Sequence, residues 1–201
     1  MEDAKDFSQS YFNNLKIAID CLDYEKIRKI AGLLADAYLK GSQIFICGNG
    51  GSATTASHFA CDLAKGTVKQ LEDEQEKRFR VISLTDNVAN MTAIGNDLSY
   101  EDIFYQQLRN LVNENDVVIG ISASGNSPNV IKAIQYAKRC KATTIGLLGF
   151  KTGGKLHDLV DYEITVQDNS YGRVEDIHLA LTHFITAYLA DLKNNTVSGE
   201  L

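Results

Sequence analysis

The sequence has no long hydrophobic run, no cluster of basic residues and only one proline among its 201 residues. Its longest apolar stretches, such as 117–121 and 143–150, are far too short to span a bilayer. The formal net charge is −6, and lysine and arginine do not gather on one predicted helix or loop as a phosphate backbone would require. We therefore expect neither a membrane nor a nucleic acid among the partners of this chain.

The sequence also lacks the cysteine spacing of a metal ribbon or a disulfide framework. Cys21, Cys47, Cys61 and Cys140 are scattered without a CxxC pair, so we expect them to be unpaired, mostly buried apolar residues. The opening residues, 1–6, are charged and are not followed by an apolar stretch, so no secretory signal is expected. Both observations favour a cytoplasmic location.

What the chain does have is a regular alternation of short apolar runs and amphipathic segments. Alternating strands and helices predict an α/β fold with a parallel sheet covered on both faces, and 201 residues can bury such a core in one domain. Strands are expected at 43–47, 79–84, 117–122, 143–148 and 162–166. Helices are expected at 8–20, 24–40, 52–65, 100–112, 128–140, 154–160 and 173–193.

Three further segments surround the predicted sheet. Residues 1–40 hold two helices whose apolar positions either pack on the sheet or contact another copy, whereas 41–193 form the α/β domain. Residues 194–201 are expected to be a flexible tail. The charged run 69–78 predicts a solvated loop or a short exposed helical extension, with a lid as the less favoured alternative.

Two glycine- and serine-rich loops carry most of the functional information. Residues 48–52 (Gly-Asn-Gly-Gly-Ser) and 122–127 (Ser-Ala-Ser-Gly-Asn-Ser) each follow a predicted strand and lead into a predicted helix. Free backbone N–H groups and the helix dipole then point at one spot, which favours an anion. A single such turn also occurs for steric reasons alone, but two at the carboxyl ends of parallel strands predict a phosphate-bearing ligand.

The helix after the first loop carries His58 and Asp62 four residues apart, on a face away from its apolar stripe. This spacing allows two side chains to hold one metal ion or one substrate. The alternative is an exposed pair that contributes only a few tenths of a kcal/mol.

The last helix repeats this design. Glu175 and His183 lie two turns apart on one face, whereas His178 is expected to pack near the core, and His157 to lie exposed in a loop. Its predicted core stripe is Val174, Ile177, Leu181, Phe184, Tyr188 and Leu192.

Two other turns could serve a ligand or only the backbone. Residues 95–97 (Gly-Asn-Asp), in the connection after the second strand, could bind a polyol or form an Asx turn. Ser127 precedes Pro128 as a helix N-cap, and 152–155 is expected to be a plain connection.

The order and spacing of these motifs resemble those of the sugar isomerase (SIS) domain family, and within it those of the phosphoheptose isomerases. The resemblance covers about 8–192 and is carried by 48–52, His58, 95–97, 122–127, Glu175 and His183.

The resemblance implies a single SIS domain: an αβα sandwich with a five-stranded parallel sheet and extra N-terminal helices that help to hold a homotetramer. It also implies active sites at subunit boundaries. The implied activity is that of an aldose–ketose isomerase, which converts sedoheptulose 7-phosphate to glycero-manno-heptose 7-phosphate through an enediol. Such an enzyme feeds heptose synthesis for lipopolysaccharide or capsule.

Site residues are carried over by position in the motifs. The resemblance implies that Asp62 is the base and His183 the acid, and that one Zn²⁺ per site is held by His58, Asp62, Glu175 and His183. The implied sugar-phosphate contacts are Asn49, Gly50, Gly51, Ser52, Asn96, Asp97, Ser122, Ala123, Ser124, Ser127 and Glu175.

The sequence departs from the family at two of these positions. The family usually has glutamate where this chain has Asp62, and glutamine where it has Glu175. A carboxylate one methylene shorter sits about 1 Å further from the reacting carbon, a shift that can cost on the order of 100-fold in rate. Glu175 therefore stays open as an alternative base, and two histidines with two carboxylates make a plausible zinc site.

Two other functions stay open at this point, because similar loops support unrelated activities. One is a non-catalytic SIS module that binds a sugar phosphate or a partner protein. The other is isomerisation of a different sugar phosphate.

Overall fold

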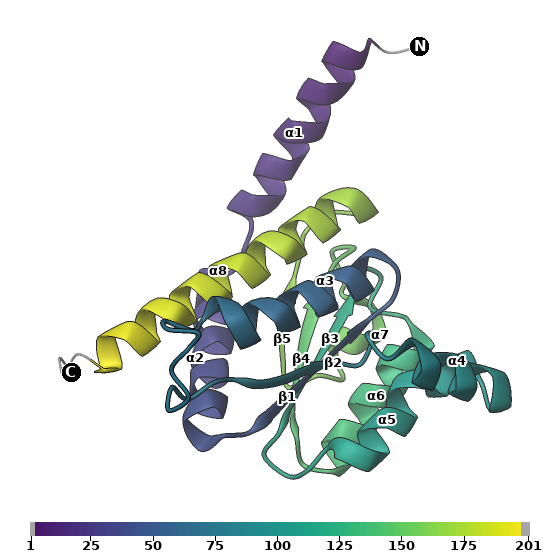
Figure 1. The fold of residues 1–201 in the computed structure, drawn as a ribbon. Coiled ribbons are helices and arrows are strands. Elements are labelled where there is room, and N and C mark those ends of the chain that lie inside the picture. Colours follow the sequence, from purple (N-terminus) through teal and green to yellow (C-terminus); the bar gives the residue numbers. More distant parts are fainter. Residues whose placement is uncertain (1–2, 198–201) are drawn as a thin grey trace.

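The computed structural model describes residues 3–197, with side chains through 195, and is built on one parallel sheet. The strand order is β2-β1-β3-β4-β5, and every neighbouring pair is parallel (Figure 1). The strands are β1 (Gln43–Gly48), β2 (Arg80–Ser83), β3 (Val117–Ser122), β4 (Thr143–Leu148) and β5 (Tyr162–Thr165). All five predicted strands are confirmed, with β2 and β5 slightly shorter than expected.

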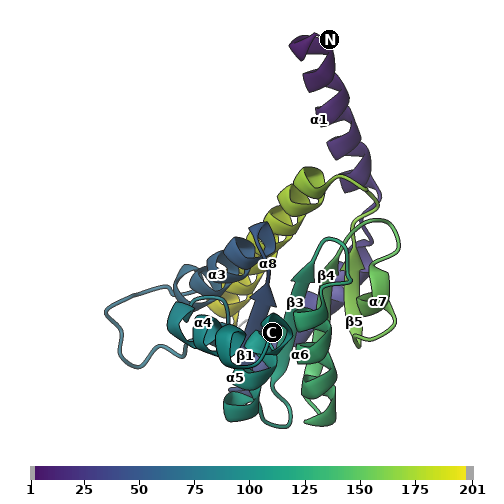
Figure 2. The same cartoon turned by 90° about the vertical axis from the view of Figure 1, so that its right-hand side faces the viewer.

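Alternating strand residues face two helical layers, because successive side chains of a strand point to opposite faces. Ile44 and Ile46 pack under α2 (Tyr24–Lys40), α3 (Gly51–Cys61) and α8 (Tyr171–Val197). Phe45 and Cys47 pack under α5 (Ile103–Leu111), α6 (Pro128–Arg139) and α7 (Gly154–His157). Figure 2 shows the two layers on either side of the sheet, so the predicted αβα sandwich is confirmed.

The first helix, α1 (Ala4–Asp20), stands out from this body (Figure 1). It touches the start of α8, where the Tyr11 hydroxyl donates to Asp176 Oδ2 at 2.9 Å. Ala18 is its one buried residue, whereas Phe7, Phe12 and Ile17 are 60–64% exposed. The N-terminal segment thus presents an apolar surface that no other part of the described residues, 3–197, covers.

Three local predictions were wrong. Residues 86–99 are not only a connection: they contain helix α4 (Val88–Asp97), capped by Asn87 and without a single buried residue. A one-turn 3₁₀ helix (Tyr100–Asp102) precedes α5, and the predicted helix 154–160 is only the four-residue α7. The core stripe of α8 continues through Ile185 and Leu189, which leaves Phe184 and Tyr188 stacked on each other and about half exposed.

The two helices that carry the site are longer than predicted at their ends. Helix α3 runs on into a π-helical turn, Asp62–Gly66, and α8 continues to Val197. The expected flexible tail 194–201 therefore begins inside a helix, and 198–201 lie outside the described residues. Within the part of the chain that the structure describes, no helix is long and apolar enough to cross a membrane.

Candidate active site

The two glycine- and serine-rich loops meet at the centre of the sheet. Strands β1 and β3 are neighbours, and their following helices, α3 and α6, leave toward opposite faces. In parallel α/β sheets this switch point leaves a crevice at the carboxyl ends of the strands, where ligands bind. The sequence motifs therefore lie where the fold provides room for a ligand.

In the first loop, Gly50 takes a left-handed φ of 55° and its carbonyl accepts the N–H groups of Ala53 and Thr54. Helix α3 begins at Gly51 without a side-chain cap. An uncapped first turn has N–H groups available to an anion, and Ser52 belongs to this turn.

The second loop is closed by its own serines. The Gly125 N–H donates to the Ser122 hydroxyl at 3.1 Å, and the Ser122 and Ser127 hydroxyls lie 3.2 Å apart. The turn 152–155, predicted to be a plain connection, supports this loop, because the Lys155 N–H donates to Asn126 Oδ1 at 3.1 Å. The hydroxyl groups of Ser122 and Ser127 are thus held close together, whereas the Ser124 hydroxyl accepts the Asn126 N–H at 3.2 Å.

Asn49 and Asn129 tie the two loops to each other. Their side-chain amides exchange two hydrogen bonds of 2.9 Å, and Asn129 is 1% exposed. The Tyr100 hydroxyl adds a third bond to Asn49 Oδ1 at 3.0 Å. Sequence reasoning missed Asn129 and Tyr100. An asparagine in the first turn of the helix after the loop was the available signal for the first of them.

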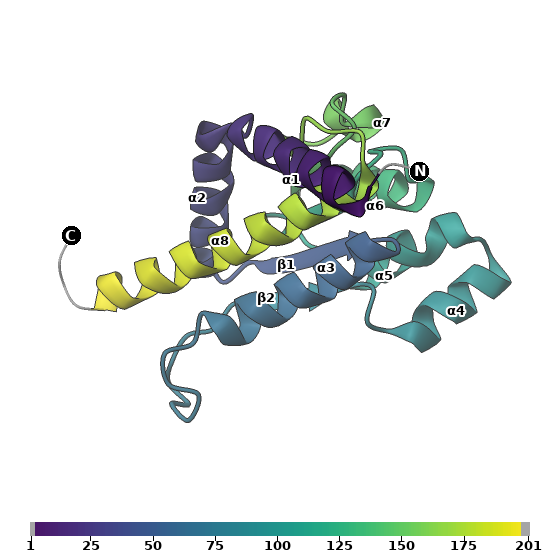
Figure 3. The same ribbon diagram turned by 90° about the horizontal axis from the view of Figure 1, so that it is seen from above.

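Helices α3 and α8 run side by side in the same direction (Figure 3). Their facing sides carry the titratable groups. His58 Nε2 lies 2.9 Å from His183 Nε2 and 3.2 Å from Asp62 Oδ2, and Asp62 Oδ2 lies 3.9 Å from His183 Nε2. The His58 and His183 side chains are about half exposed, whereas Asp62 is 26% exposed. Three of the four predicted helix-face residues, His58, Asp62 and His183, therefore form one cluster that opens to the surface.

This donor set fits a zinc ion. His58, Asp62 and His183 each offer one ligand atom, and these atoms lie within 4.8 Å of one another. Donors on a tetrahedron with bonds of 2.0–2.1 Å lie about 3.4 Å apart, and the observed separations bracket that value. Two histidines and one carboxylate with a fourth open position are also typical of catalytic zinc.

Glu175, the fourth predicted ligand, is not part of this cluster within one chain. It precedes His183 by eight residues on α8, which corresponds to about 12 Å along the axis. Its carboxylate instead lies against Gly51 at the start of α3, where an added Cβ would be 2.7 Å from Glu175 Oε1. The two carboxylates of the site therefore have separate places: Asp62 beside the histidines and Glu175 beside the first loop.

Two residues predicted to contact the sugar, and one histidine predicted to pack near the core, lie outside the cluster. Asn96 and Asp97 are exposed in the last turn of α4, where their side chains are hydrogen-bonded to each other at 2.9 Å. Helix α4 stands away from α8 (Figures 1 and 3). His178 is packed as predicted: it is 0% exposed, and its Nε2–H donates to the Leu148 carbonyl at 2.9 Å. Burial lowers the pKa of His178 to about 4.

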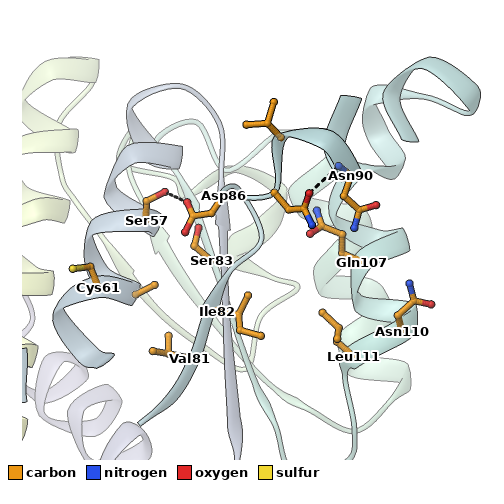
Figure 4. A pocket seen from close by; sticks show the side chains of 13 residues that line it. Ser57, Cys61, Val81, Ile82, Ser83, Asp86, Asn90, Gln107, Asn110 and Leu111 are labelled. Carbon is orange, nitrogen blue, oxygen red and sulfur yellow. Dashed lines mark hydrogen bonds between the residues drawn. The ribbon is translucent and has the colours of Figure 1, made fainter. Parts of the chain in front are cut away.

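A hollow of about 870 Å³ lies on the other side of α3, along the edge of the sheet (Figure 4). Ser57 and Cys61 of α3 line it, together with β2 and the start of α4. The Ser57 hydroxyl donates a hydrogen bond to Asp86 Oδ1 there, and it lies 3.0 Å from the hydroxyl of Thr85. None of the residues predicted for the site lines this hollow, so α3 separates it from the histidines.

Comparison with known proteins defines the class of this molecule. The SIS domain model matches residues 10–149, and the chain belongs to this family. Curated relatives then place it among the phosphoheptose isomerases. It is 41% identical over 158 residues to phosphoheptose isomerase of Campylobacter jejuni, covering 79% of this chain and 82% of the relative. It is 40% identical over 159 residues to phosphoheptose isomerase of Helicobacter hepaticus, covering 79% and 78%.

Solved structures agree with this placement. The phosphoheptose isomerase of Neisseria gonorrhoeae superposes with a TM-score of 0.83 at 28% identity, covering 94% of this chain and all of that one. A phosphoheptose isomerase from Francisella tularensis gives a TM-score of 0.84 at 27% identity, covering 94% and 99%. The α/β fold derived from the strands and helices is therefore that of the family.

Proposed function

We propose that this chain is an aldose–ketose isomerase that converts sedoheptulose 7-phosphate to glycero-manno-heptose 7-phosphate, for heptose synthesis in surface polysaccharides. The observation that carries the proposal is the His58–Asp62–His183 cluster on the two helices that flank the first loop. Its relatives are phosphoheptose isomerases, and the cluster retains both the acidic and the basic groups that such a reaction needs.

The two loops bind the sugar phosphate. The phosphate is held by Ser52, Ser122, Ser124 and Ser127 and by the backbone of the first loop (Asn49, Gly50, Gly51) and of Ala123. Backbone N–H groups and hydroxyls suit a phosphate because they donate several hydrogen bonds to its oxygens. They carry no charge of their own, so no counter-ion has to leave the site first. The Asn49–Asn129 pair keeps the two loops in register. Asn96 and Asp97 stay predicted contacts for the sugar hydroxyls.

In the ketose, a proton is removed from C1 and a proton is delivered to the C2 oxygen, which gives an enediol. A proton is then delivered to C2 and the proton on the C1 oxygen is removed, which gives the aldose. Asp62 takes and returns the carbon-bound proton, and His183 moves the proton on oxygen. Asp62 is the better base because it lies beside both histidines, whereas Glu175 lies beside the first loop. A positioned acid–base pair of this kind typically contributes 10²–10⁴-fold in rate.

His58, Asp62 and His183 would also hold a zinc ion. When bound, it would polarise the substrate oxygens at C1 and C2 and so stabilise the charge that develops on them. Asp62 and His183 belong to both sets, and a ring nitrogen that binds zinc cannot at the same time exchange a proton. Zinc content and activity must therefore be measured separately in the variants of both residues, with and without the ion.

Glu175 would reach such a cluster from a neighbouring subunit. Within one chain it stands about two helical turns from His183, so it ligates the same ion only across a boundary between copies. The exposed apolar side chains of α1 support a homotetramer, since Phe7, Phe12 and Ile17 need a partner surface. In this arrangement each active site combines residues of two subunits.

We also place the enzyme in the cytoplasm. All four cysteines, Cys21, Cys47, Cys61 and Cys140, lie in the described part of the chain and are free thiols. Free thiols are typical of a reducing compartment.

The test is to incubate metal-analysed protein with sedoheptulose 7-phosphate and to follow the aldose by NMR, with and without added zinc. We expect turnover and about one zinc ion per chain. His58→Ala should lower the zinc content, whereas His157→Ala, which changes a histidine outside the cluster, should not. The mass of the particle in solution, from light scattering, should correspond to four chains.

A further inference from the structure

The segment 67–79, between the π-helical turn and β2, contains neither a helix nor a strand. Hydrogen bonds nevertheless join its beginning to its end, and we call it the closed loop. The Glu76 carboxylate accepts the Lys69 N–H at 3.0 Å and the Gln70 N–H at 2.9 Å. The Arg78 guanidinium donates to the Leu71 carbonyl at 2.7 Å. Backbone groups at the beginning of the segment are thus fixed by side chains at its end, which a solvated or swinging loop would not show.

Helix α8 anchors this closed loop through Lys193. The Lys193 side chain is 8% exposed, and its Nζ donates to the Thr67 carbonyl at 2.8 Å and to Glu76 Oε1 at 3.1 Å. A buried ammonium is costly unless it is paired and hydrogen-bonded, and here the Thr67 carbonyl and the Glu76 carboxylate of the loop accept hydrogen bonds from it. The backbone hydrogen bonds from Gln70 and Lys69, together with Lys193, hold the pKa of Glu76 at about 2. The Glu76 carboxylate is therefore charged at every physiological pH.

Helix α2 holds the far end of the segment. The Tyr38 hydroxyl donates to the Lys77 carbonyl at 3.2 Å, and Lys77 Nζ donates to the Leu39 carbonyl at 2.8 Å. The loop extends outward from the body in Figure 2, but it is attached to two helices of one layer.

The anchored loop forms one wall of a hollow beside Asp62, the candidate catalytic carboxylate. Asp62 and Lys65 line one side of this space, which has a volume of about 500 Å³, and Val68, Gln70 and Leu71 line the other. Leu71 is 51% exposed and adds an apolar surface to a rim that is otherwise polar. Asp62 belongs both to this lining and to the cluster with the two histidines, so the hollow borders the cluster on the side of the loop, although neither histidine lines it.

We propose that Glu76 and Lys193 are a positioning pair that fixes the loop 67–79 as a rigid wall beside Asp62, and that this wall determines which sugar chains reach Asp62. The inference rests on the proposed function, since it concerns the substrate of that same site. The wall selects a hydroxylated sugar end that packs against Leu71 and bonds to Gln70. It also identifies the charged run of the sequence as a fixed part of the site and not as a lid.

Two readouts test this proposal, and only one of them needs a substrate. The first is the rate of tryptic cleavage within 69–78, where Lys69, Lys77 and Arg78 offer cleavage sites. The second is the division of any kinetic effect between KM and kcat. The variants are Glu76→Gln and Lys193→Met, with Lys193→Arg as the conservative change. Glu74→Gln is the matched control, because it neutralises an exposed carboxylate of the same loop.

We expect Glu76→Gln and Lys193→Met to be cleaved about tenfold faster and to show a KM raised about tenfold, with kcat and zinc content within twofold of the parent. Glu74→Gln should match the parent, and Lys193→Arg should recover part of the protection. Unchanged cleavage would overturn the anchoring. Faster cleavage with an unchanged KM would overturn the role in positioning. If the parent protein does not isomerise the sugar phosphate, the proposed function fails by itself, and the cleavage rates still decide whether the pair anchors the loop.

Discussion

The Nε2 atoms of His58 and His183 lie 2.9 Å apart, although 125 residues separate the two histidines in the sequence. Two imidazoles can approach this closely only if one ring nitrogen donates to the other or if both face a shared cation. With Asp62 Oδ2 3.2 Å from His58, the arrangement serves either proton transfer or zinc binding. The parallel packing of α3 and α8 is what brings these groups together.

Asp62→Asn and His183→Ala should each reduce kcat by about 100-fold or more, because each removes one partner of the proton transfer. The rate is measured by NMR with sedoheptulose 7-phosphate at saturating concentration. Asp36→Asn, which changes an exposed carboxylate on α2, is the control and should leave kcat unchanged. Full activity in either variant would contradict the role assigned to that residue.

Complementation between two inactive variants tests whether the site spans two copies. Asp62→Asn and Glu175→Ala should each be inactive as pure proteins. When the two are mixed, dissociated and reassembled, some boundaries combine an intact Asp62 with an intact Glu175 from different chains. Activity should therefore reappear, up to about a quarter of the parent value if assembly is random. Mixtures that stay inactive would show that each chain supplies both residues to its own site.

Gly125→Ala should damage the second loop. Gly125 has a left-handed φ of 61°, and an added Cβ would overlap the carbonyl group of Gly153. We expect a loss of about 2 kcal/mol in the free energy of unfolding and a raised KM for the sugar phosphate. Gly32→Ala, inside α2 with no atom near the new methyl group, should instead stabilise by about 0.5–1 kcal/mol. Urea unfolding measures both, and equal effects would refute the steric argument.

The buried His178 predicts a pH dependence of stability. Its pKa falls from the ordinary 6.5 to about 4, so between these values the unfolded chain binds a proton that the folded chain does not. Stability should therefore rise as the pH increases from 4 to 6.5, by about 2 to 3 kcal/mol.

A His178→Gln variant isolates this effect, because its amide can still donate to the Leu148 carbonyl. Urea unfolding between pH 4 and 7 should show a shallower slope for the variant than for the parent. Identical slopes would mean that other groups cause the dependence.

Much of this architecture could be predicted from the sequence, because β1, β3 and β4 are continuous apolar runs and glycine-rich turns mark their ends. Helix α4 was not predicted: none of its residues is fully buried, and its apolar residues Met91 and Ile94 pack only partly against the core. The exposed positions of Phe184 and Tyr188 were also unpredictable from the spacing, because either of two adjacent stripes along α8 is apolar enough to face the core.

The candidate site could also be predicted from the sequence only in part. Helical spacing placed His58 with Asp62, since both lie on one helix, and the family resemblance paired them with His183. Spacing alone does not show that α8 runs parallel to α3, so the place of Glu175 beside Gly51 came from tertiary packing. The contact between Lys193 and Glu76, which anchors the charged loop, could not be predicted either, because the two residues are 117 positions apart.

The most direct test is the conversion of sedoheptulose 7-phosphate by the purified, metal-analysed protein, followed by NMR of the C1 proton in deuterated water. We expect the aldose 7-phosphate to appear and the carbon-bound proton to exchange with solvent, and both to be lost in Asp62→Asn. A folded protein that binds the sugar phosphate without producing the aldose, both with and without zinc, would contradict the proposed isomerisation.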